Sequence, residues 1–352
     1  MLENFEQYSQ ASLFSALLIY ALAFIFYAVD LANRAGDDGA TSIAAPRDSD
    51  RSKTKAVRIG FSLTVLGWVF HLAATVLRGL EGGRVPWANM YEFSLTATLA
   101  IVTIFILVQF VYDLRFLGTL ITGLVLVFLG LTRMNYFVSS VPLPPALDSY
   151  WLVIHIVVAV LAVAFLTLSF GLSIAQLLQA RRESVLAAQA KANKASGATV
   201  MASAGASGSV VVADGPALTD AARTGSDEPA GKRPSKAPFA FLRSFPNSNA
   251  LENLSYRMVI IGFVFWTFTL IAGSIWAEHA WGRYWGFDTK EVWTFIIWVL
   301  YAGFIHARAT RGWRGNRSAW LSIIAYSTVI FNFTIVNVFF KGLHAYSGLP
   351  TG

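Results

Sequence analysis

The chain contains no cysteine among its 352 residues. This absence excludes disulfide bonds, iron–sulfur clusters held by thiolates, cysteine nucleophiles and cysteine-type zinc sites. Any thiol chemistry in which the chain takes part must therefore come from a partner protein.

Charge is also scarce, because Asp, Glu, Lys and Arg make up 13% of the residues whereas 55% are hydrophobic. A water-soluble core does not need so many apolar side chains. Apolar runs long enough to cross about 30 Å of hydrocarbon recur along the chain. They lie at about 12–29, 59–77, 92–112, 116–132, 151–178, 257–276, 291–307 and 318–340. The pattern predicts an all-α polytopic membrane protein with about eight transmembrane helices, the first of them retained rather than cleaved as a signal peptide.

Lysine and arginine predict the orientation, because cytoplasmic loops hold most of the positive charge. The segments 30–58, 113–115, 179–257 and 308–317 carry 21 of the 27 Lys and Arg residues. We therefore expect these segments to be cytoplasmic and both termini to be extracytoplasmic. Topology also accounts for the net charge of +7, so no nucleic-acid partner is expected.

Composition divides the chain into three regions. Residues 1–178 form an N-terminal five-helix membrane region, and 251–352 form a C-terminal three-helix membrane region. Between them, 179–250 is rich in Ala, Gly and Ser with scattered Lys, and such a composition buries too little apolar surface to offset chain entropy. The sequence predicts a disordered cytoplasmic linker there.

Polar chemistry gathers in one stretch, WAEHAWGRYWGFDTKEVW at 276–293, which we expect to be extracytoplasmic. Six of the eleven tryptophans fall between 266 and 298. Single tryptophans near a membrane boundary are usually part of the aromatic belt. A belt does not require Arg283, Asp288, Lys290 and Glu291 among the tryptophans, so this stretch is a candidate site.

The predicted topology sorts the five histidines by depth. His155, at the outer end of the fifth span, and His344, after the last span, lie at the same surface and can meet. His306 lies roughly 20 Å deeper, because it comes about fifteen residues into the seventh span. For His71 and His279 we expect the commoner role of an intramembrane histidine, a hydrogen bond between packed helices.

An aromatic surface flanked by two imidazoles suits a flat, apolar, iron-containing ring. Imidazole binds the iron axially, indoles cover the faces of the ring, and cations pair with its carboxylate side groups. These properties indicate haem.

Together the motifs resemble a known family. WAEHAWGRYWGFDTKEVW, with YWLVIH, WVLYAGFIHAR, VNVFFKGLHAYSG and RGLEGGRVPWANMYEF, is similar to the haem-handling proteins of cytochrome c biogenesis. More specifically, the chain resembles the CcsA-type (CcsB or ResC) subunit of the System II cytochrome c synthase. It covers the membrane core at roughly 55–178 and 251–352.

The resemblance implies roles for individual residues. His155 and His344 match two outward histidines that ligate haem, and His306 matches a deeper axial ligand whose opposing ligand comes from a ResB-type membrane subunit. The family commonly has Trp-Asp-Pro-Lys-Glu where this chain has Phe287, Asp288, Thr289, Lys290 and Glu291. Phe287, in place of Trp, keeps an aromatic face but lacks the indole N–H, and Thr289, in place of Pro, has a backbone N–H that proline lacks. Neither of these two changes is expected to inactivate the protein.

From both lines of reasoning we expect haem b to enter near His306 and to dock outside between His155 and His344. The docking platform is predicted to be Trp276, Trp281, Trp285 and Trp293. The vinyl groups of the docked haem would then react with the thiols of an apocytochrome c Cys-x-x-Cys-His segment. A thioredoxin-like protein would keep these thiols reduced. This haem lyase chemistry would take place at the outer face of a bacterial plasma membrane.

Four charged residues of the motif have two possible roles. Asp288 and Glu291 are candidate catalytic groups that orient the reactants, and Arg283 and Lys290 are candidates to bind haem propionates. Salt bridging at the bilayer surface is an equally open role for all four. Two other functions also stay open for the chain: haem export without bond formation, and a non-catalytic membrane scaffold.

Overall fold

The computed structural model describes residues 2–35, 48–140, 148–206, 239–340 and 342. Within these residues every regular element is helical. The long helices are α1 (Leu2–Ala35), α2 (Asp48–Gly82), α3 (Met90–Val108), α4 (Gly118–Asn135), α5 (Tyr150–Ala206), α6 (Ser248–Trp281), α7 (Thr289–Arg311) and α8 (Asn316–Phe331). Short turns of helix are η1 (Arg115–Leu117), η3 (Ala240–Ser244), η4 (Asn332–Val336) and α9 (Asn337–Phe339). Eight helical stretches are long and apolar enough to cross a membrane, which confirms the predicted fold class.

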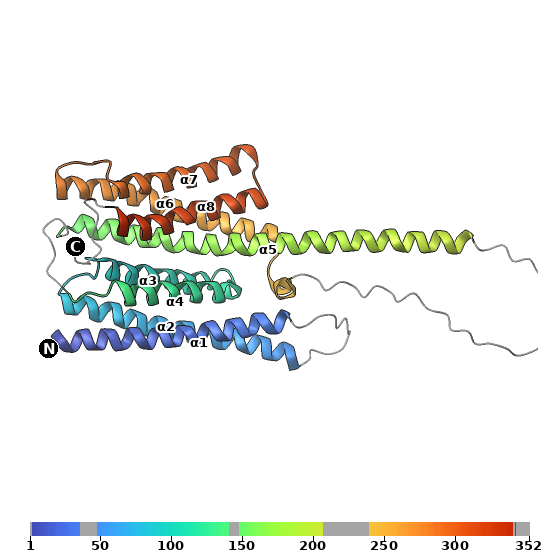
Figure 1. The fold of residues 1–352 in the computed structure, drawn as a ribbon, viewed down its shortest axis with the longest axis horizontal. Helices are drawn as coiled ribbons and strands as arrows, with labels where there is room; N and C mark the ends of the chain where they lie inside the picture. Colours follow the sequence, from blue (N-terminus) through green and yellow to red (C-terminus); the bar gives the residue numbers. More distant parts are fainter. Residues whose placement is uncertain (1, 36–47, 141–147, 207–238, 341, 343–352) are drawn as a thin grey trace, which may run out of the picture.

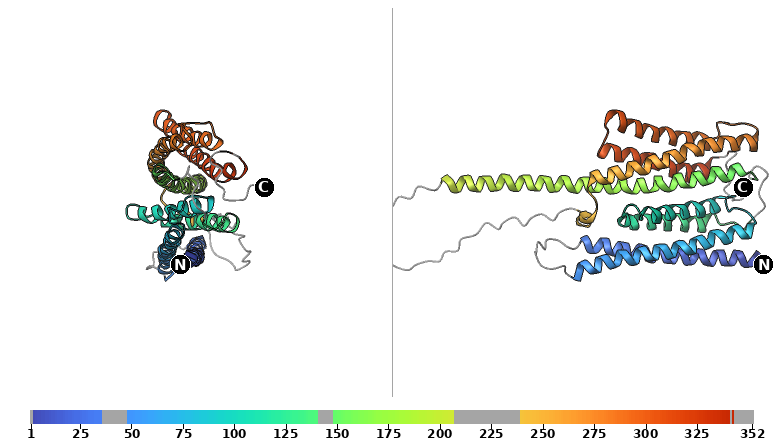
Figure 2. Two further views of the ribbon diagram at one scale, coloured as in Figure 1. Left: turned by 90° about the vertical axis from the view of Figure 1, so that its left-hand side faces the viewer. Right: turned by 180° about the vertical axis from the view of Figure 1, so that it is seen from behind.

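The helices lie side by side along one axis (Figure 1). The pair α1 and α2 forms one edge of the bundle, α3 and α4 come next, and α5 separates them from α6, α7 and α8 (Figures 1 and 2). We call the end where α6 stops and α7 begins the aromatic end, and the end where α7 stops and α8 begins the linker end. The first helix begins and α9 ends at the aromatic end, as an even number of crossings requires.

Capping residues set several helix boundaries. Asn89 and Asn247 each precede a helix and accept a hydrogen bond from a backbone N–H of its first turn, at 2.9 Å from Glu92 N and 2.8 Å from Ala250 N. At their C-terminal ends, α6 and α7 stop at Gly282 and Gly312, whose φ angles of 68° and 59° favour glycine. These stops position the polar stretch 282–288 between two membrane helices.

Buried hydroxyl groups join the central helices. The Ser169 hydroxyl on α5 lies 2.9 Å from Ser255 Oγ on α6 and 3.1 Å from Ser322 Oγ on α8. Between α5 and α6, Gly262 contacts Leu166 so closely that a Cβ there would lie 2.8 Å from it. Small residues and interhelical hydrogen bonds are the usual means by which membrane helices pack, and here they form the scaffold of the site.

An ion pair closes the linker end of the bundle. Arg308 of α7 donates to the buried carboxylate of Glu252 on α6 at 2.8 Å. The other oxygen of Glu252 accepts from Gly315 N, in the turn before α8, at 2.9 Å. One carboxylate therefore holds three helices together at this end.

The predicted disorder of 179–250 is wrong for its first part. Helix α5 continues through residue 178 to Ala206 and extends past the other helices (Figure 1). Alanine, the strongest helix former, is abundant in this segment. The segment also continues a helix that the membrane span has already nucleated, so only propagation is needed. Further along, Ala240–Ser244 form η3 and α6 begins at Ser248, whereas 207–238 lie outside the described residues.

Candidate functional site

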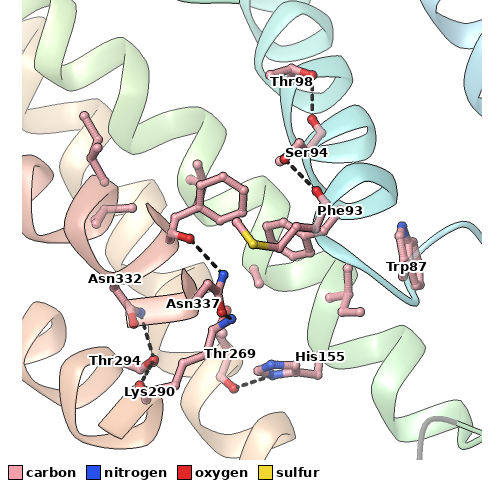
Figure 3. A pocket seen from close by; sticks show the side chains of 18 of the residues that line it. Trp87, Phe93, Ser94, Thr98, His155, Thr269, Lys290, Thr294, Asn332 and Asn337 are labelled. Atoms are coloured by element: carbon pink, nitrogen blue, oxygen red, sulfur yellow. Dashed lines mark hydrogen bonds between the residues drawn. The ribbon is translucent and has the colours of Figure 1, made fainter. Parts of the chain in front are cut away.

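A cavity of about 210 Å³ lies among α3, α5, α6, α7 and α8 near the aromatic end, and we call it the inner cavity. Most of its wall is apolar or aromatic, and a few polar groups point into it (Figure 3). The polar and aromatic residues of the wall include Trp87, Asn89, His155, Thr269, Trp276, Lys290, Thr294, Asn332 and Asn337. An apolar cavity with a small number of convergent polar groups is the usual form of a ligand site.

His155 is held in one orientation and one tautomer. Its Nδ1 lies 2.9 Å from the carbonyl oxygen of Thr269 on α6 (Figure 3). A carbonyl oxygen only accepts, so Nδ1 carries the proton and Nε2 carries the lone pair that can bind a metal. Gly273 permits this close approach, because a Cβ at that position would lie 2.7 Å from His155 Cε1.

One predicted tryptophan, Trp276, lies beside His155, and a second, Trp281, packs against it. The Trp276 indole stacks on the imidazole, with ring centroids 5.9 Å apart and planes 15° from parallel. Trp281 packs edge-on against Trp276 at 4.8 Å. Trp87, from the turn between α2 and α3, also lines the inner cavity and donates from Nε1 to Thr96 Oγ1 at 3.1 Å. Aromatic rings and an imidazole therefore meet at one wall.

The other two predicted tryptophans lie elsewhere. Trp285 lines a separate groove of about 620 Å³ with Leu270, Ile271, Ser274, Ile275, Phe287 and Phe295. Trp293 packs against Phe331 of α8 at 4.4 Å and does not line the inner cavity. The predicted four-tryptophan platform is thus divided in the structure: Trp276 stacks on His155 and Trp281 packs against Trp276, whereas Trp285 and Trp293 have other neighbours.

Lys290 points into the inner cavity from the second position of α7. Its ammonium donates to Asn337 Oδ1, and its backbone carbonyl accepts from Thr294 Oγ1 at 2.7 Å (Figure 3). Arg283, the other predicted cation, is exposed in the loop before α7 and donates to Gly286 O at 3.3 Å. The structure therefore separates the two cations and brings only Lys290 to the cavity.

Asp288 and Glu291 form a capping box at the start of α7. The Asp288 side chain accepts from the backbone N–H at position 291, and Glu291 Oε2 accepts from Asp288 N at 3.1 Å and from Gly286 N at 2.8 Å. This arrangement satisfies backbone donors that the first helical turn leaves unpaired. In this geometry both carboxylates fix the start of α7, which carries Lys290, and do not line the inner cavity.

The remaining histidines occupy three different settings. His71 is buried between helices, accepts from the Tyr20 hydroxyl at 3.3 Å and donates to Leu95 O at 3.0 Å, so both of its nitrogens serve the predicted packing role. His279 is exposed, with Nδ1 2.9 Å from Ile275 O. His306 lies near the linker end of α7, is exposed on the surface of the bundle and does not approach His155. His344 lies outside the described residues, so its predicted meeting with His155 stays a prediction.

Three asparagines of the site were not predicted. Asn89 belongs to RGLEGGRVPWANMYEF, whose overall similarity gave it no individual role. Asn332 and Asn337 are uncharged amides inside an apolar run, and polar side chains at membrane depth are a recognisable mark of a functional surface. Within the described residues no three His, Asp or Glu side chains cluster to hold a metal ion, so iron binding would depend on single imidazoles.

Comparisons with known proteins agree on one family. Residues 87–344 match the family model of the cytochrome C assembly protein. The chain is 33% identical over 283 residues to the cytochrome c biogenesis protein CcsA of Synechococcus elongatus, covering 76% of this chain and 81% of that one. It is 32% identical over 295 residues to CcsA of Synechocystis sp., covering 79% and 85%, and 29% identical over 294 residues to CcsA of Guillardia theta, covering 83% and 86%.

A solved structure has a similar fold. The cytochrome c haem lyase CcmF superposes with a TM-score of 0.51 at 15% identity. The superposition covers 92% of this chain but 46% of that longer protein. At this identity the match shows a shared helical fold only.

Proposed function

The chain belongs to the cytochrome C assembly protein family, and from this premise we propose that it binds haem b at the inner cavity and presents it for covalent attachment to apocytochrome c. One observation carries the proposal: His155, with its Nδ1 hydrogen-bonded to Thr269 O, lines a cavity that is also walled by Trp276. Neutral imidazole in this tautomer is the usual axial ligand of haem iron.

The size of the cavity supports partial enclosure of the ring. Pockets that enclose a small ligand measure roughly 300–1,000 Å³, and the inner cavity measures about 210 Å³. A cavity of this volume takes one edge of a macrocycle and leaves the rest at its mouth. An exposed edge is what attachment needs, because a second protein has to reach the vinyl groups.

The bonds formed require no outside electrons. Each thiol of a reduced Cys-x-x-Cys-His segment adds its S–H across one vinyl C=C: sulfur bonds to the carbon next to the ring, and hydrogen goes to the terminal carbon. The chain contributes by positioning, since near-attack geometry alone lowers a barrier by about 7–11 kcal/mol. A thioredoxin-like reductant supplies the dithiol form, because this chain has no cysteine to exchange with it.

Other residues of the motif have supporting roles in this proposal. Lys290 faces the propionates from the cavity wall, and Arg283 meets the exposed part of the ring or the incoming polypeptide. Asp288 and Glu291 act as positioning residues through the α7 cap. His344 is the second axial ligand, and the Cys-x-x-Cys-His histidine replaces one of the two when the product leaves.

A partner completes the deeper site. His306 is exposed on α7, and imidazole in contact with lipid is unfavourable. A ResB-type membrane subunit that brings a second imidazole to this face would both cover His306 and form a bis-imidazole haem site. We propose that haem is held there after it leaves the cytoplasm of a bacterial cell and before it reaches the inner cavity.

One experiment distinguishes haem attachment from haem export and from a scaffold role. The chain, purified with its partner from cells that coexpress a Cys-x-x-Cys-His protein, is expected to show low-spin haem absorption and to yield thioether-linked product. His155→Ala should remove or shift the absorption and stop attachment, and added imidazole should partly restore both. His279→Ala is the matched control, because that histidine is exposed and outside the inner cavity.

Each alternative has its own outcome. A scaffold would carry no haem in the wild-type complex. An exporter would carry haem, yet it would give no thioether product with reduced apocytochrome. Normal maturation of cytochromes by the His155→Ala variant would refute the proposed role of the inner cavity.

A further inference from the structure

The turn between α7 and α8 carries three exposed arginines, Arg311, Arg314 and Arg317, which we call the arginine turn. The stretches on either side, Thr289–Arg311 and Asn316–Phe339, are both long and apolar enough to cross a membrane. The arginine turn therefore lies at the bilayer surface of the linker end (Figure 1). Its three positive charges are at the level of the lipid headgroups.

The charges of the arginine turn are not neutralised by the chain. No salt bridge in the part of the chain that the structure describes includes any of the three guanidinium groups. The Glu252 carboxylate contacts this turn through Gly315 N, but it is buried and already paired with Arg308. At the same end of the bundle, by contrast, Arg115 pairs with the neighbouring Asp113. The arginine turn is thus open to an anion from outside the chain.

One exposed face of α8 continues from the arginine turn into the bilayer. Arg317, Trp320 and Ile324 are three and seven positions apart, so they share a face of the helix. Trp320 is 56% exposed and Ile324 is 51% exposed, whereas Ser318 and Ser322 on another face are buried. The order along the exposed face is a cation, an indole and an aliphatic side chain. A phospholipid has the matching order of phosphate, interfacial region, where indoles are favoured, and acyl chain.

The choice of arginine favours a phosphate ligand. A guanidinium group is planar, pairs with two phosphate oxygens at once and also stacks on aromatic rings. Arg317 already lies over the Trp313 indole, with its Cζ 5.9 Å from the ring centroid. A zwitterionic headgroup carries its own cation next to the phosphate, and three arginines repel that cation. The arginine turn therefore favours a headgroup with a net negative charge.

We propose that the arginine turn, together with Trp320 and Ile324, binds an anionic phospholipid of the surrounding bilayer. The phosphate pairs with Arg314 and Arg317, the interfacial part of the lipid contacts Trp320, and an acyl chain lies along Ile324. The bound lipid neutralises the turn and holds the adjoining ends of α7 and α8 together. This site is at the opposite end of the bundle from the inner cavity, and its occupancy does not depend on haem.

The test measures binding of lipid to the purified full chain by native mass spectrometry from detergent micelles. Two probes are compared: dioleoylphosphatidylglycerol, which is anionic, and dioleoylphosphatidylcholine, which has the same acyl chains and a zwitterionic headgroup. The wild type is expected to bind the anionic lipid at least about tenfold more tightly, because several arginines at the membrane surface act on one headgroup.

Two double variants locate the preference. Arg314→Gln/Arg317→Gln should weaken binding of phosphatidylglycerol by about tenfold or more and leave binding of phosphatidylcholine within about twofold. Arg181→Gln/Arg243→Gln is the matched control, because it removes the same charge from two exposed arginines on α5 and η3. The control should keep the wild-type preference. All four side chains are exposed, so both variants are expected to fold, and thermal unfolding without added lipid checks this.

Each result decides for or against the lipid site. Loss of the preference in Arg314→Gln/Arg317→Gln alone supports it. Equal affinity of the wild type for the two lipids would refute it. An equal loss in the Arg181→Gln/Arg243→Gln control would show that net charge alone attracts the lipid, and would refute it as well. Displacement of the bound lipid by inorganic phosphate would assign the arginine turn to a free anion and would also overturn the proposal.

Discussion

Arg78 and Glu92 form an ion pair in which each side chain is only 1% exposed, with Arg78 Nε 3.0 Å from Glu92 Oε1. Arg78 also donates to Val138 O at 2.7 Å, and Glu92 Oε2 accepts from Arg84 at 2.7 Å and from Ala88 N at 2.9 Å. This network fixes the turn between α2 and α3. The same turn carries Trp87 and Asn89 into the inner cavity.

Removing one member of this pair should be more damaging than removing both. Arg78→Met removes the ion pairs that Arg78 makes with Glu92 and Glu81 and leaves Glu92 paired with Arg84, and the expected loss in the free energy of unfolding is about 3–5 kcal/mol. The double variant Arg78→Met/Glu92→Leu should recover part of that loss. Unfolding in mixed detergent micelles measures all three variants, and equal damage from the single and double variants would contradict a buried ion pair.

Gly273→Ala tests whether the orientation of His155 matters for the reaction. The added Cβ would lie 2.7 Å from His155 Cε1 and 2.8 Å from Nδ1, so the imidazole has to move from Thr269 O. A displacement of this size is expected to slow thioether formation on the order of 100-fold and to shift the haem absorption, with the helical fold kept. Gly130→Ala on α4 is the control, since no atom lies within 4 Å of a Cβ added there. Equal rates for the two variants would show that His155 orientation is not important.

Asparagine at position 288 distinguishes a cap from a chemical role for the carboxylate. Asparagine caps a helix as well as aspartate does, whereas alanine costs about 1 kcal/mol. We expect Asp288→Asn to mature cytochromes at close to the wild-type rate and Asp288→Ala to lose stability and activity together. Yield of haem-stained cytochrome and thermal denaturation of the purified protein check the two effects. An inactive but stable Asp288→Asn protein would favour the predicted catalytic role instead.

The orientation of the bundle can be tested with reporters. The distribution of Lys and Arg predicts that the loop at Gly282 lies outside the cytoplasm and that position 208 lies inside it. An alkaline phosphatase domain inserted at Gly282 should be active, and the same domain at Gly208 should be inactive. A reporter that is active only in the cytoplasm should give the opposite pair of results. Cytoplasmic activity at Gly282 would place the motif 276–293 on the wrong side for attachment to an exported cytochrome.

Hydropathy and charge predicted the number and approximate positions of the membrane helices because the bilayer fixes their length and polarity. The same reasoning failed at residues 179–206, where it counted apolar burial and neglected the helix propensity of alanine. Burial is one way to order a segment, and extension of an existing helix is another. Composition alone did not distinguish the two.

The site was predictable only in part. His155, Trp276 and Lys290 belong to recognised motifs and do line one cavity. The separation of the four tryptophans into different places was not predictable from the sequence. It depends on the end of α6 at Gly282 and on the start of α7 after Asp288. Asn332 and Asn337 were missed because a regular helix would turn them apart, and the π-helical turn that aligns them has no clear mark in the sequence.

We expect a partner subunit to dock on α7. His306 is exposed on this helix, and Gly303, one turn earlier, has no atom within 4 Å of a Cβ added to it. Glycine at such a position lets a second membrane helix approach closely. Gly303→Leu should therefore weaken copurification of a ResB-type subunit and remove haem from the His306 site, yet leave the stability of the isolated chain within about 0.5 kcal/mol. Gly130→Leu on α4 is the matched control, because Gly130 is equally open but lies on a helix without a histidine. Normal copurification of the Gly303→Leu protein, or full bis-imidazole haem near His306 in the isolated chain, would contradict docking of a partner on this face of α7.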